Sequence, residues 1–322
     1  MNILISGSAG FIGFSLSKYF LNKKYKVLGI DNLNNYYDVN LKKKRIEILR
    51  KYKNFTFKKI DLNENYQLET IFKKNKIDFI FNLAAQAGVR YSIKQPRKYI
   101  DSNVEGFFNI IECAKKYKVK RLFYASSSSV YGENKNFPLK EKEQIIPKNI
   151  YSLTKKINEE ISLIYKNFYN VKSTGLRFFT VYGEWGRPDM MMLKFINAFF
   201  QKKKFELFNY GNHHRDFTYI GDAVKMMDIL LTNHQKLKDC DVLNVCSSQP
   251  LNLKKVINFL QQKNIKPQII KKSLQKADIL KTHGDNKKIL RITKYKNFLD
   301  WRIGIDRTIK WYLDFYVNRI KK

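Results

Sequence analysis

Cysteine is scarce in this chain of 322 residues. Cys113, Cys240 and Cys246 are too few and too scattered for a disulfide framework, and no spacing of histidines and cysteines indicates a bound metal. The chain also lacks any apolar run of about 18 or more residues, which excludes a membrane-spanning helix. Its start lacks the apolar segment, about 7–15 residues long, of a secretory signal, so we expect a protein of the reducing cytoplasm.

Acidic residues are few as well: 28 Asp and Glu stand against 62 Lys and Arg, a formal net charge of +34. Such a charge would suit nucleic-acid binding or the attraction of an anionic small molecule. The basic residues, however, occur in short runs along the whole chain, and Lys, Asn, Ile, Phe and Tyr are all abundant, as in proteins of AT-rich genomes. We therefore expect compositional bias rather than a nucleic-acid partner, and keep a non-catalytic RNA-binding protein as the alternative.

Short β-branched or aromatic runs alternate with stretches of helical period through residue 180. The predicted strands are residues 2–6, 26–30, 56–60, 79–83, 121–126 and 171–178. The predicted helices between them are residues 11–23, 39–51, 66–75, 97–117 and 151–168. This order predicts an α/β fold in which residues 1–180 form a dinucleotide-binding domain around a doubly wound parallel Rossmann sheet.

Beyond residue 180 the pattern is less regular. The predicted strands there lie near residues 205–208 and 242–245, and the predicted helices near 222–231 and 253–262. We expect residues 181–322 to form mainly a smaller α/β substrate-binding lobe that closes over a cleft, with some segments returning to the Rossmann sheet.

The first predicted strand runs directly into a glycine-rich turn, Gly7 to Gly13, and a predicted helix follows. Glycine suits such a turn because the backbone must approach a pyrophosphate closely, and the helix N-terminus faces the negative charge. Asp31 ends the second predicted strand, where a carboxylate would bind the ribose hydroxyls of adenosine and repel a 2′-phosphate. The pattern therefore predicts a dinucleotide site that favours NAD over NADP.

The Gly-x-x-Gly-x-x-Gly spacing of this turn resembles the extended short-chain dehydrogenase/reductase family, the NAD-dependent epimerases and dehydratases. Asp61-Leu62 after the third predicted strand and Leu83-Ala84-Ala85 after the fourth match stretches that lie along the cofactor in this family. The resemblance implies that NAD contacts Gly7, Gly10, Phe11, Ile12, Gly13, Asp31, Asn32, Asp61, Leu62, Leu83, Ala84, Ala85, Tyr151 and Lys155.

Tyr151 and Lys155 are four residues apart and would lie on one face of a helix. A free tyrosine ionises near pH ~10, but a lysine cation and a positive nicotinamide ring both favour the phenolate, so we expect a lowered pKa for Tyr151 and a role as the catalytic base. The resembling family completes this pair with a serine that shares its proton with the tyrosine. By the family's pattern this serine is Ser127, although the run of four serines leaves a neighbouring serine as the alternative.

Three reactions of nucleotide sugars share this Tyr/Lys/NAD machinery in the resembling family: 4-epimerisation, 4,6-dehydration and decarboxylation. The dehydratases carry Asp-Glu just after the catalytic Ser or Thr, and the decarboxylases carry a Glu near that point. Ser128 and Ser129 stand there in this chain, and serine cannot serve as the additional acid or base. The two serines therefore favour 4-epimerisation, which needs no further group.

Nearly the whole chain further resembles UDP-glucuronate 4-epimerases. The matching stretches are residues 84–92, 126–129, 175–183, 185–190 and 215–220, with a single match at residue 278. The resemblance implies conversion of UDP-glucuronate to UDP-galacturonate, as used in polysaccharide biosynthesis. It implies substrate contacts at Arg90, Ser128, Ser129, Thr180, Arg187, Arg215 and Asp278.

Arg187, Thr180 and the serines would surround the sugar carboxylate, because arginine binds a carboxylate with two charge-assisted hydrogen bonds and hydroxyls complete the shell. The alternative substrates are UDP-glucose and UDP-N-acetylhexosamines, although galactose epimerases carry Asn where Thr180 stands. Glu184 replaces the family's usual proline, and we expect its charge to lie close to the carboxylate site. The resemblance also implies a homodimer joined by the predicted helices 97–117 and 151–168.

Overall fold

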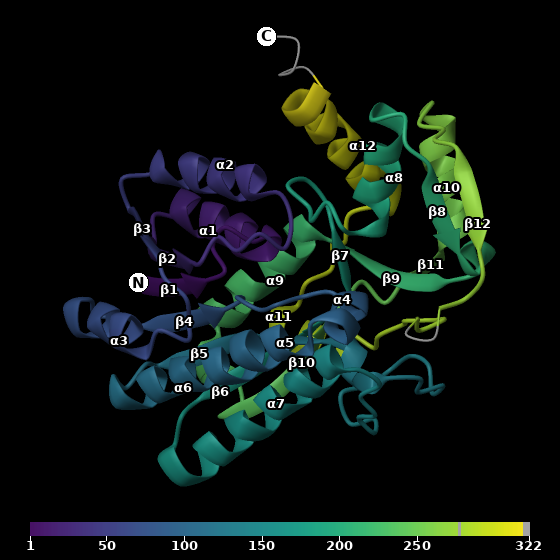
Figure 1. Ribbon diagram of the computed structural model, residues 1–322. Helices are drawn as coiled ribbons and strands as arrows, with labels where there is room; N and C mark the ends of the chain where they lie inside the picture. Colours follow the sequence, from purple (N-terminus) through teal and green to yellow (C-terminus); the bar gives the residue numbers. More distant parts are fainter. Residues whose placement is uncertain (276–277, 318–322) are drawn as a thin grey trace.

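A seven-stranded parallel sheet forms the centre of the protein (Figure 1). The computed structural model describes residues 1–275 and 278–317. The sheet order is β10-β6-β5-β4-β1-β2-β3. Its strands are β1 (Asn2–Ser6), β2 (Lys26–Asp31), β3 (Phe55–Lys59), β4 (Phe79–Asn82), β5 (Arg121–Ser127), β6 (Ser173–Phe178) and β10 (Cys240–Val245). The predicted α/β fold with a doubly wound Rossmann sheet is confirmed.

Helices cover both faces of this sheet. One layer contains α1 (Phe11–Asn22), α2 (Val39–Arg50) and α9 (Ile220–Thr232), and the other contains α3 (Asn65–Lys74), α6 (Gly106–Lys116) and α7 (Ile150–Tyr169). Alternate strand residues enter separate apolar clusters, with Ile3 and Ile5 in one and Leu4 in the other. Because both faces are covered, β1, β4 and β6 are buried along nearly their whole length.

The predicted helix 97–117 is confirmed, and it contains a π-helical segment that the sequence did not predict. The structure has α5 (Pro96–Tyr99), a π-helical segment η1 (Ile100–Glu105) and then α6, and a further short helix, α4 (Val89–Lys94), precedes them. Within η1 the buried Asn103 donates hydrogen bonds to the Gln86 carbonyl at 3.1 Å and to the Thr154 hydroxyl at 3.0 Å. The wider π turn therefore directs a polar side chain towards the loop after β4 and towards α7, as π-bulges often do near functional sites.

The smaller lobe lies beyond the carboxyl ends of the central strands (Figure 1). It contains the three-stranded sheet β11-β9-β7 and the parallel pair β12-β8. Its strands are β7 (Thr180–Tyr182), β8 (Phe205–Phe208), β9 (His214–Tyr219), β11 (Pro250–Asn252) and β12 (Ile269–Lys272). Its helices are α8 (Met191–Phe200), α10 (Leu253–Gln262) and α12 (Trp301–Tyr312).

The predicted strand near 242–245 belongs to the central sheet, where β10 pairs with β6, and α9 packs against α1. Both elements therefore return from the second half of the chain to the Rossmann sheet. The division of the chain at residue 180 stays a prediction. The remaining elements are α11 (Lys287–Thr293) and the short segments η2 (Ser128–Tyr131), η3 (Asn209–Gly211), η4 (His234–Lys236) and η5 (Leu313–Val317).

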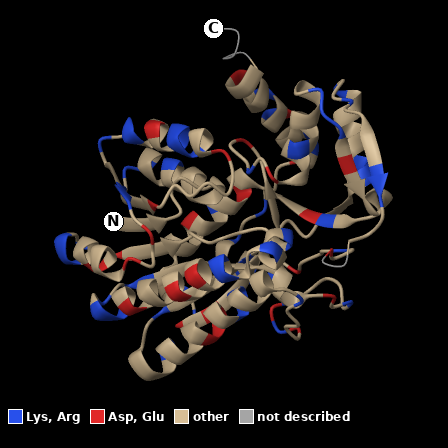
Figure 2. Ribbon diagram, in the orientation of Figure 1, with Lys and Arg blue, Asp and Glu red and all other residues tan. Residues whose placement is uncertain are grey.

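Basic side chains are spread over both helical layers and over the smaller lobe (Figure 2). This distribution agrees with the scattered Lys and Arg runs of the sequence, and a nucleic-acid site would gather such residues on one face. Among residues 1–275 and 278–317, no helix is long and apolar enough to cross a membrane.

Candidate active site

A large cavity lies where the carboxyl ends of the central strands face the smaller lobe. Its volume is about 1170 Å³, above the roughly 300–1,000 Å³ of a pocket for one small ligand. Every residue that the sequence assigns to a site lines it: Gly7, Gly10, Phe11, Ile12, Gly13, Asp31, Asn32, Asp61, Leu62, Leu83, Ala84, Ala85, Arg90, Ser127, Ser128, Ser129, Tyr151, Lys155, Thr180, Arg187, Arg215 and Asp278. The fold thus brings these residues to one place, while their individual roles stay predictions.

The glycine turn between β1 and α1 leaves no room for side chains. Gly7 has φ of +71°, and a Cβ there would lie 2.7 Å from the Ala84 nitrogen. A Cβ on Gly13 would lie 2.1 Å from the Gly7 carbonyl oxygen. The helix α1 begins at Phe11 with its free N–H groups at the cavity wall. This turn fits the pyrophosphate of a dinucleotide, which needs close backbone approach and a helix N-terminus.

Asp31 ends β2 and lies almost buried in the cavity wall. Its carboxylate accepts hydrogen bonds from the Leu33 nitrogen at 2.8 Å and the Ala9 nitrogen at 3.2 Å. Burial raises the pKa of Asp31, and the positive charge of Lys42 opposes that shift. Lys42 is a buried cation of the cavity wall. No pattern in the sequence distinguishes it, because it lies near the start of an amphipathic helix that contains two other lysines.

The three proposed catalytic residues come from adjacent elements. Ser127 ends β5, and Tyr151 lies in the first turn of α7, whose start is fixed by a capping box between Asn149 and Ser152. One turn later, the Lys155 ammonium donates a hydrogen bond to the Ala125 carbonyl at 2.8 Å. The cap and the lysine together fix α7 against the end of β5, which brings the phenol of Tyr151 and the hydroxyl of Ser127 to the same cavity wall.

The lowered pKa expected for Tyr151 includes the effect of a bound nicotinamide ring, and it stays a prediction. Burial raises the pKa of this phenol, while the hydrogen bond with Ser127 and the positive charge of Arg187 lower it in part. Burial lowers the pKa of Lys155 to about 8, and the negative charge of Glu159 opposes this shift. Desolvation of the site therefore outweighs the effect that a neighbouring lysine would have on a solvated tyrosine.

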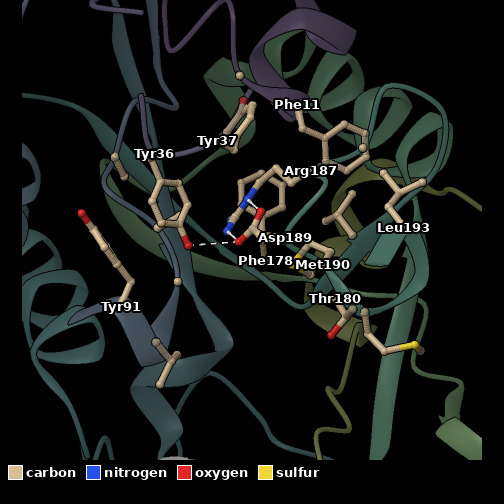
Figure 3. A pocket seen from close by; sticks show the side chains of 18 of the residues that line it. Phe11, Tyr36, Tyr37, Tyr91, Phe178, Thr180, Arg187, Asp189, Met190 and Leu193 are labelled. Atoms are coloured by element: carbon tan, nitrogen blue, oxygen red, sulfur yellow. Dashed lines mark hydrogen bonds and ion pairs between the residues drawn. The ribbon is translucent and has the colours of Figure 1, made fainter. Parts of the chain in front are cut away.

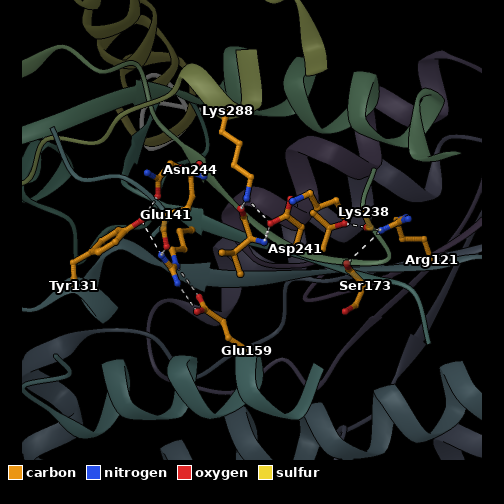
Figure 4. A network of polar contacts seen from close by, with 12 residues as sticks. Arg121, Tyr131, Glu141, Glu159, Ser173, Lys238, Asp241, Asn244 and Lys288 are labelled. Atoms are coloured by element: carbon orange, nitrogen blue, oxygen red, sulfur yellow. Dashed lines mark hydrogen bonds and ion pairs between the residues drawn. The ribbon is translucent and has the colours of Figure 1, made fainter. Parts of the chain in front are cut away.

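A buried polar network joins α7 to the central strands β5 and β6 (Figure 4). Arg177 on β6 donates to both carboxylate oxygens of Glu159 on α7, at 2.9 and 2.6 Å, and to the Tyr131 hydroxyl at 2.9 Å. The Ser126 hydroxyl also donates to Glu159, at 2.5 Å. Because Glu159 is one turn beyond Lys155, this network ties α7 to β5 and β6. The partners come from separate elements, so no local pattern in the sequence predicts the network.

Arg187 is paired with a carboxylate of the protein itself (Figure 3). Its Nε and Nη2 donate to Asp189 at 3.0 and 2.5 Å, and the Tyr36 hydroxyl donates to the same carboxylate at 3.0 Å. Although burial opposes both shifts, the pairing raises the pKa of Arg187 and lowers that of Asp189. Arg187 is therefore a charged group of the cavity wall with one edge already bonded. The Arg-Pro-Asp spacing was the available signal for Asp189.

Arg90 and Asp278, both expected to contact substrate, form an ion pair with each other. Arg90 on α4 donates to Asp278 at 3.2 Å from Nε and at 2.8 Å from Nη2, and its guanidinium lies 4.2 Å from the Phe208 ring centroid. Arg215 donates to the Leu280 carbonyl at 3.2 Å, and burial lowers its pKa to about 10. This end of the cavity therefore carries two arginines and one carboxylate, a charge balance suited to an anionic ligand.

The expectation for Glu184 is wrong. Its carboxylate accepts a hydrogen bond from the Tyr219 hydroxyl at 2.8 Å and lines a separate small hollow with Trp185 and Trp311. Trp185 has φ of +60°, so the chain turns sharply between Glu184 and Arg187. The negative charge of Glu184 therefore lies outside the cavity, whereas Ser128 and Ser129 line the cavity.

No group of three or more His, Cys, Asp or Glu suited to a metal ion occurs among residues 1–275 and 278–317. Cys113, Cys240 and Cys246 are all free thiols.

Comparisons with known proteins agree with this geometry. Residues 3–246 match the model of the NAD dependent epimerase/dehydratase family. A protein of uncharacterized function from Methanocaldococcus jannaschii is 44% identical over 97% of this chain and 96% of its own. A UDP-glucuronate 4-epimerase from Thermodesulfobacterium geofontis is 35% identical over 96% of this chain and 95% of its own. The structure of a UDP-glucuronic acid 4-epimerase from Bacillus cereus, in complex with UDP-glucuronic acid and NAD, is 28% identical, with a TM-score of 0.91 and coverage of 98% and 100%.

Proposed function

Because this chain belongs to the NAD-dependent epimerase/dehydratase family, we propose that it interconverts UDP-glucuronate and UDP-galacturonate by inverting C4 of the sugar. One observation carries the choice of a uronate. The cavity wall that contains Tyr151 also contains Arg187, whose positive charge acts on the Tyr151 phenol. A sugar with O4 at Tyr151 would therefore have a cation within reach of a C5 carboxylate. Thr180, Ser128 and Ser129 supply hydroxyls to the same cavity.

NAD is the cofactor of the family, and when bound it would supply a hydride acceptor and donor for C4 of the sugar. The residues that fit it are the glycine turn around Gly7 and Gly13, with Asp31 at the adenosine ribose. We assign the pyrophosphate to this turn because its glycines leave the backbone N–H groups accessible, whereas side chains at Gly7 and Gly13 would clash with the backbone.

The protein's own residues handle the proton. As C4 loses its hydride, Tyr151 accepts the proton of O4, and a hydrogen bond from Ser127 holds O4 during this transfer. The product of this half-reaction is a 4-keto sugar. In the return half-reaction Tyr151 gives the same proton back to O4, so the net reaction consumes no acid, base or reductant. The Lys155 ammonium donates a hydrogen bond to the Ala125 carbonyl and lies 6.0 Å from the centroid of the Tyr151 ring.

The serines of η2 argue against the other reactions of the family. Elimination of water from the 4-keto sugar needs a further acid and base, and Ser128 and Ser129 supply neither. Oxidation of a glucuronate at C4 also creates a β-keto acid, which loses carbon dioxide when its carboxylate stands perpendicular to the ketone. We propose that Arg187 and the hydroxyls of Thr180 and Ser129 hold the carboxylate away from that orientation.

The second candidate is 4-epimerisation of a neutral UDP-hexose, such as UDP-glucose or a UDP-N-acetylhexosamine. Asp189 favours it, because the paired carboxylate cancels the charge of Arg187 even without a uronate. A neutral sugar would then leave Arg187 paired with a carboxylate of the protein itself.

We also propose that the protein works as a homodimer. The outer faces of α6 and α7 expose apolar side chains, among them Phe108, Leu153, Ile164 and Phe168, the last 74% exposed. Apolar residues adjacent on two neighbouring helices suit a face that a second copy covers. Light scattering on the wild type and on Phe168→Asp tests this, with a shift to monomer expected in the variant.

The activity test compares three substrates on the NAD-loaded protein. UDP-glucuronate, UDP-glucose and UDP-N-acetylglucosamine are incubated in parallel, and the 4-epimers are separated by anion exchange and identified by NMR. UDP-galacturonate as the preferred product supports the proposal. A higher kcat/KM for UDP-glucose would overturn it in favour of the second candidate.

A further inference from the structure

We propose that Asp189 and Tyr36 are positioning residues that hold one edge of the Arg187 guanidinium, so that its other edge meets the sugar carboxylate at a fixed angle. This inference rests on the proposed function, since it requires a uronate. It goes beyond that function by naming the residues that set the orientation of the carboxylate-binding arginine.

The first support is the count of donors on Arg187. A guanidinium has five N–H donors in one plane. Asp189 takes two of them, one on Nε and one on Nη2. The Tyr36 hydroxyl is also in hydrogen-bond contact with this guanidinium. The donors that Asp189 and Tyr36 leave unused can bind a second carboxylate, and one arginine can bind two carboxylates at the same time.

The second support is the rigidity of the main chain that leads to Arg187. The buried Arg45 on α2 donates to the carbonyls of Trp185 and Gly186 and, at 2.7 Å, to the carbonyl of Ala9 in the glycine turn. The backbone before Arg187 is thereby tied to the dinucleotide half of the cavity. What is left to fix is the long side chain itself, and the contacts with Asp189 and Tyr36 do this (Figure 3).

The third support is the place built for Tyr36. This residue follows β2 in the dinucleotide half, yet its hydroxyl reaches Asp189 in the smaller lobe, and its ring centroid lies 5.8 Å from the Arg187 guanidinium. A Cβ on Gly88 would lie 2.2 Å from the Tyr36 hydroxyl oxygen. A glycine at residue 88 is therefore needed for the tyrosine to take this position. Tyr36 thus bonds the carboxylate that holds the arginine and covers part of the guanidinium.

Geometry, rather than net charge, then sets the preference for a uronate. Arg187 and Asp189 together carry no net charge. The net charge of this pair therefore cannot discriminate strongly between a uronate and a neutral hexose. A guanidinium that Asp189 and Tyr36 hold in one orientation instead sets the plane of the bound carboxylate. The orientation of that carboxylate relative to the 4-ketone decides between epimerisation and loss of carbon dioxide. Asp189 and Tyr36 should therefore affect the product ratio as well as affinity.

The test uses the NAD-loaded protein with Asp189→Asn and Tyr36→Phe, and with Asp306→Asn as control. Asp306 pairs with Lys263 on the outer face of α12, so the control makes the same chemical change far from the cavity. For Asp189→Asn we expect KM for UDP-glucuronate to rise about tenfold, KM for UDP-glucose to change less than about twofold, and UDP-pentose to appear. Tyr36→Phe should raise KM for UDP-glucuronate by about threefold and should also increase the share of UDP-pentose.

Each other outcome is decisive. A lower KM for UDP-glucuronate in Asp189→Asn would show that Asp189 competes with the substrate, which overturns the inference. An equal rise of KM for both sugars without pentose would show a merely structural role. If Asp189→Asn does not fold, Tyr36→Phe decides alone, because it removes only a hydroxyl. A wild type inactive on UDP-glucuronate overturns the proposed function and this inference together, whereas an active wild type with unchanged variants overturns the inference only.

Discussion

The two halves of the cavity are built in different ways. The dinucleotide half is shaped by backbone: a turn whose glycines at positions 7 and 13 exclude side chains, next to the first turn of α1. The other half is shaped by contacts between polar side chains. The Arg187–Asp189 pair is local, but Tyr36 reaches Asp189, and Arg90 reaches Asp278, from distant segments. A turn lies within a few consecutive residues, whereas contacts between distant segments require folding. The first kind of site can be recognised in a sequence, and the second mostly cannot.

Tyr151→Phe should have the largest effect, because Tyr151 lies where the two halves meet and transfers the proton in both half-reactions. We expect turnover of any accepted nucleotide sugar to fall roughly thousandfold, with little change in NAD binding. Steady-state assays and calorimetry with NAD measure the two quantities. Tyr165→Phe, on the same helix but outside the cavity, should leave turnover unchanged. Full activity in Tyr151→Phe would contradict the assignment of the base.

Arg187→His breaks the side-chain half alone. The shorter, largely neutral imidazole cannot keep the two-pronged bond to a carboxylate, so kcat/KM for UDP-glucuronate should fall roughly hundredfold. The share of UDP-pentose should rise, because the carboxylate of the 4-keto sugar is freed. UDP-glucose serves as the control substrate and should be less affected. Unchanged epimerisation together with unchanged pentose would show that Arg187 has no such role.

Gly13→Ala breaks the backbone half. The added Cβ would lie 2.1 Å from the Gly7 carbonyl oxygen, so α1 must move away from the turn. We expect NAD to bind roughly tenfold more weakly, while binding of UDP alone stays unchanged. Ser15→Ala, which shortens a side chain on the same helix, is the control. Equal losses of NAD and UDP affinity would mean that the two halves are not separate.

Lys155→Met tests a difference between two buried cations. Arg187 has a carboxylate partner, whereas Lys155 has the Ala125 carbonyl, and burial lowers its pKa to about 8. Because this folded-state value lies below the ordinary 10.5, charged Lys155 destabilises the fold fully below pH 8 and progressively less from pH 8 to 10.5.

Lys155→Met should therefore lose activity. Its free energy of unfolding at pH 7 should rise by about 2 kcal/mol, because removing the buried charge stabilises the fold by more than the lost hydrogen bond to Ala125 destabilises it. Thermal unfolding at pH 7 and pH 9.5 checks this, and the gain should shrink at the higher pH. A gain that is the same at both values would exclude the titration of Lys155 as its cause.

The sequence-based predictions succeeded where the signal is local. The strands and helices of the Rossmann sheet were placed close to their observed bounds, and the glycine turn and the Tyr151/Lys155 pair lie in the predicted context of strand, turn and helix. Two features that depend on packing gave no local signal. The helix 97–117 contains a π-helical turn from which Asn103 bonds to Gln86 and Thr154. In the protein without NAD, burial raises the pKa of Tyr151, although the positive charge of Arg187 opposes that shift.

Residues along a single strand, turn or helix thus specify the parallel sheet, the dinucleotide turn and the face that carries Tyr151 and Lys155, because backbone sterics and helical periodicity act over a few residues. Folding alone determines that Tyr36 meets Asp189, that Arg45 bonds the loop before Arg187, and that Glu184 points out of the cavity. Hydrogen bonds and ion pairs act over about 3 Å, and which distant side chains come that close depends on how the two lobes pack.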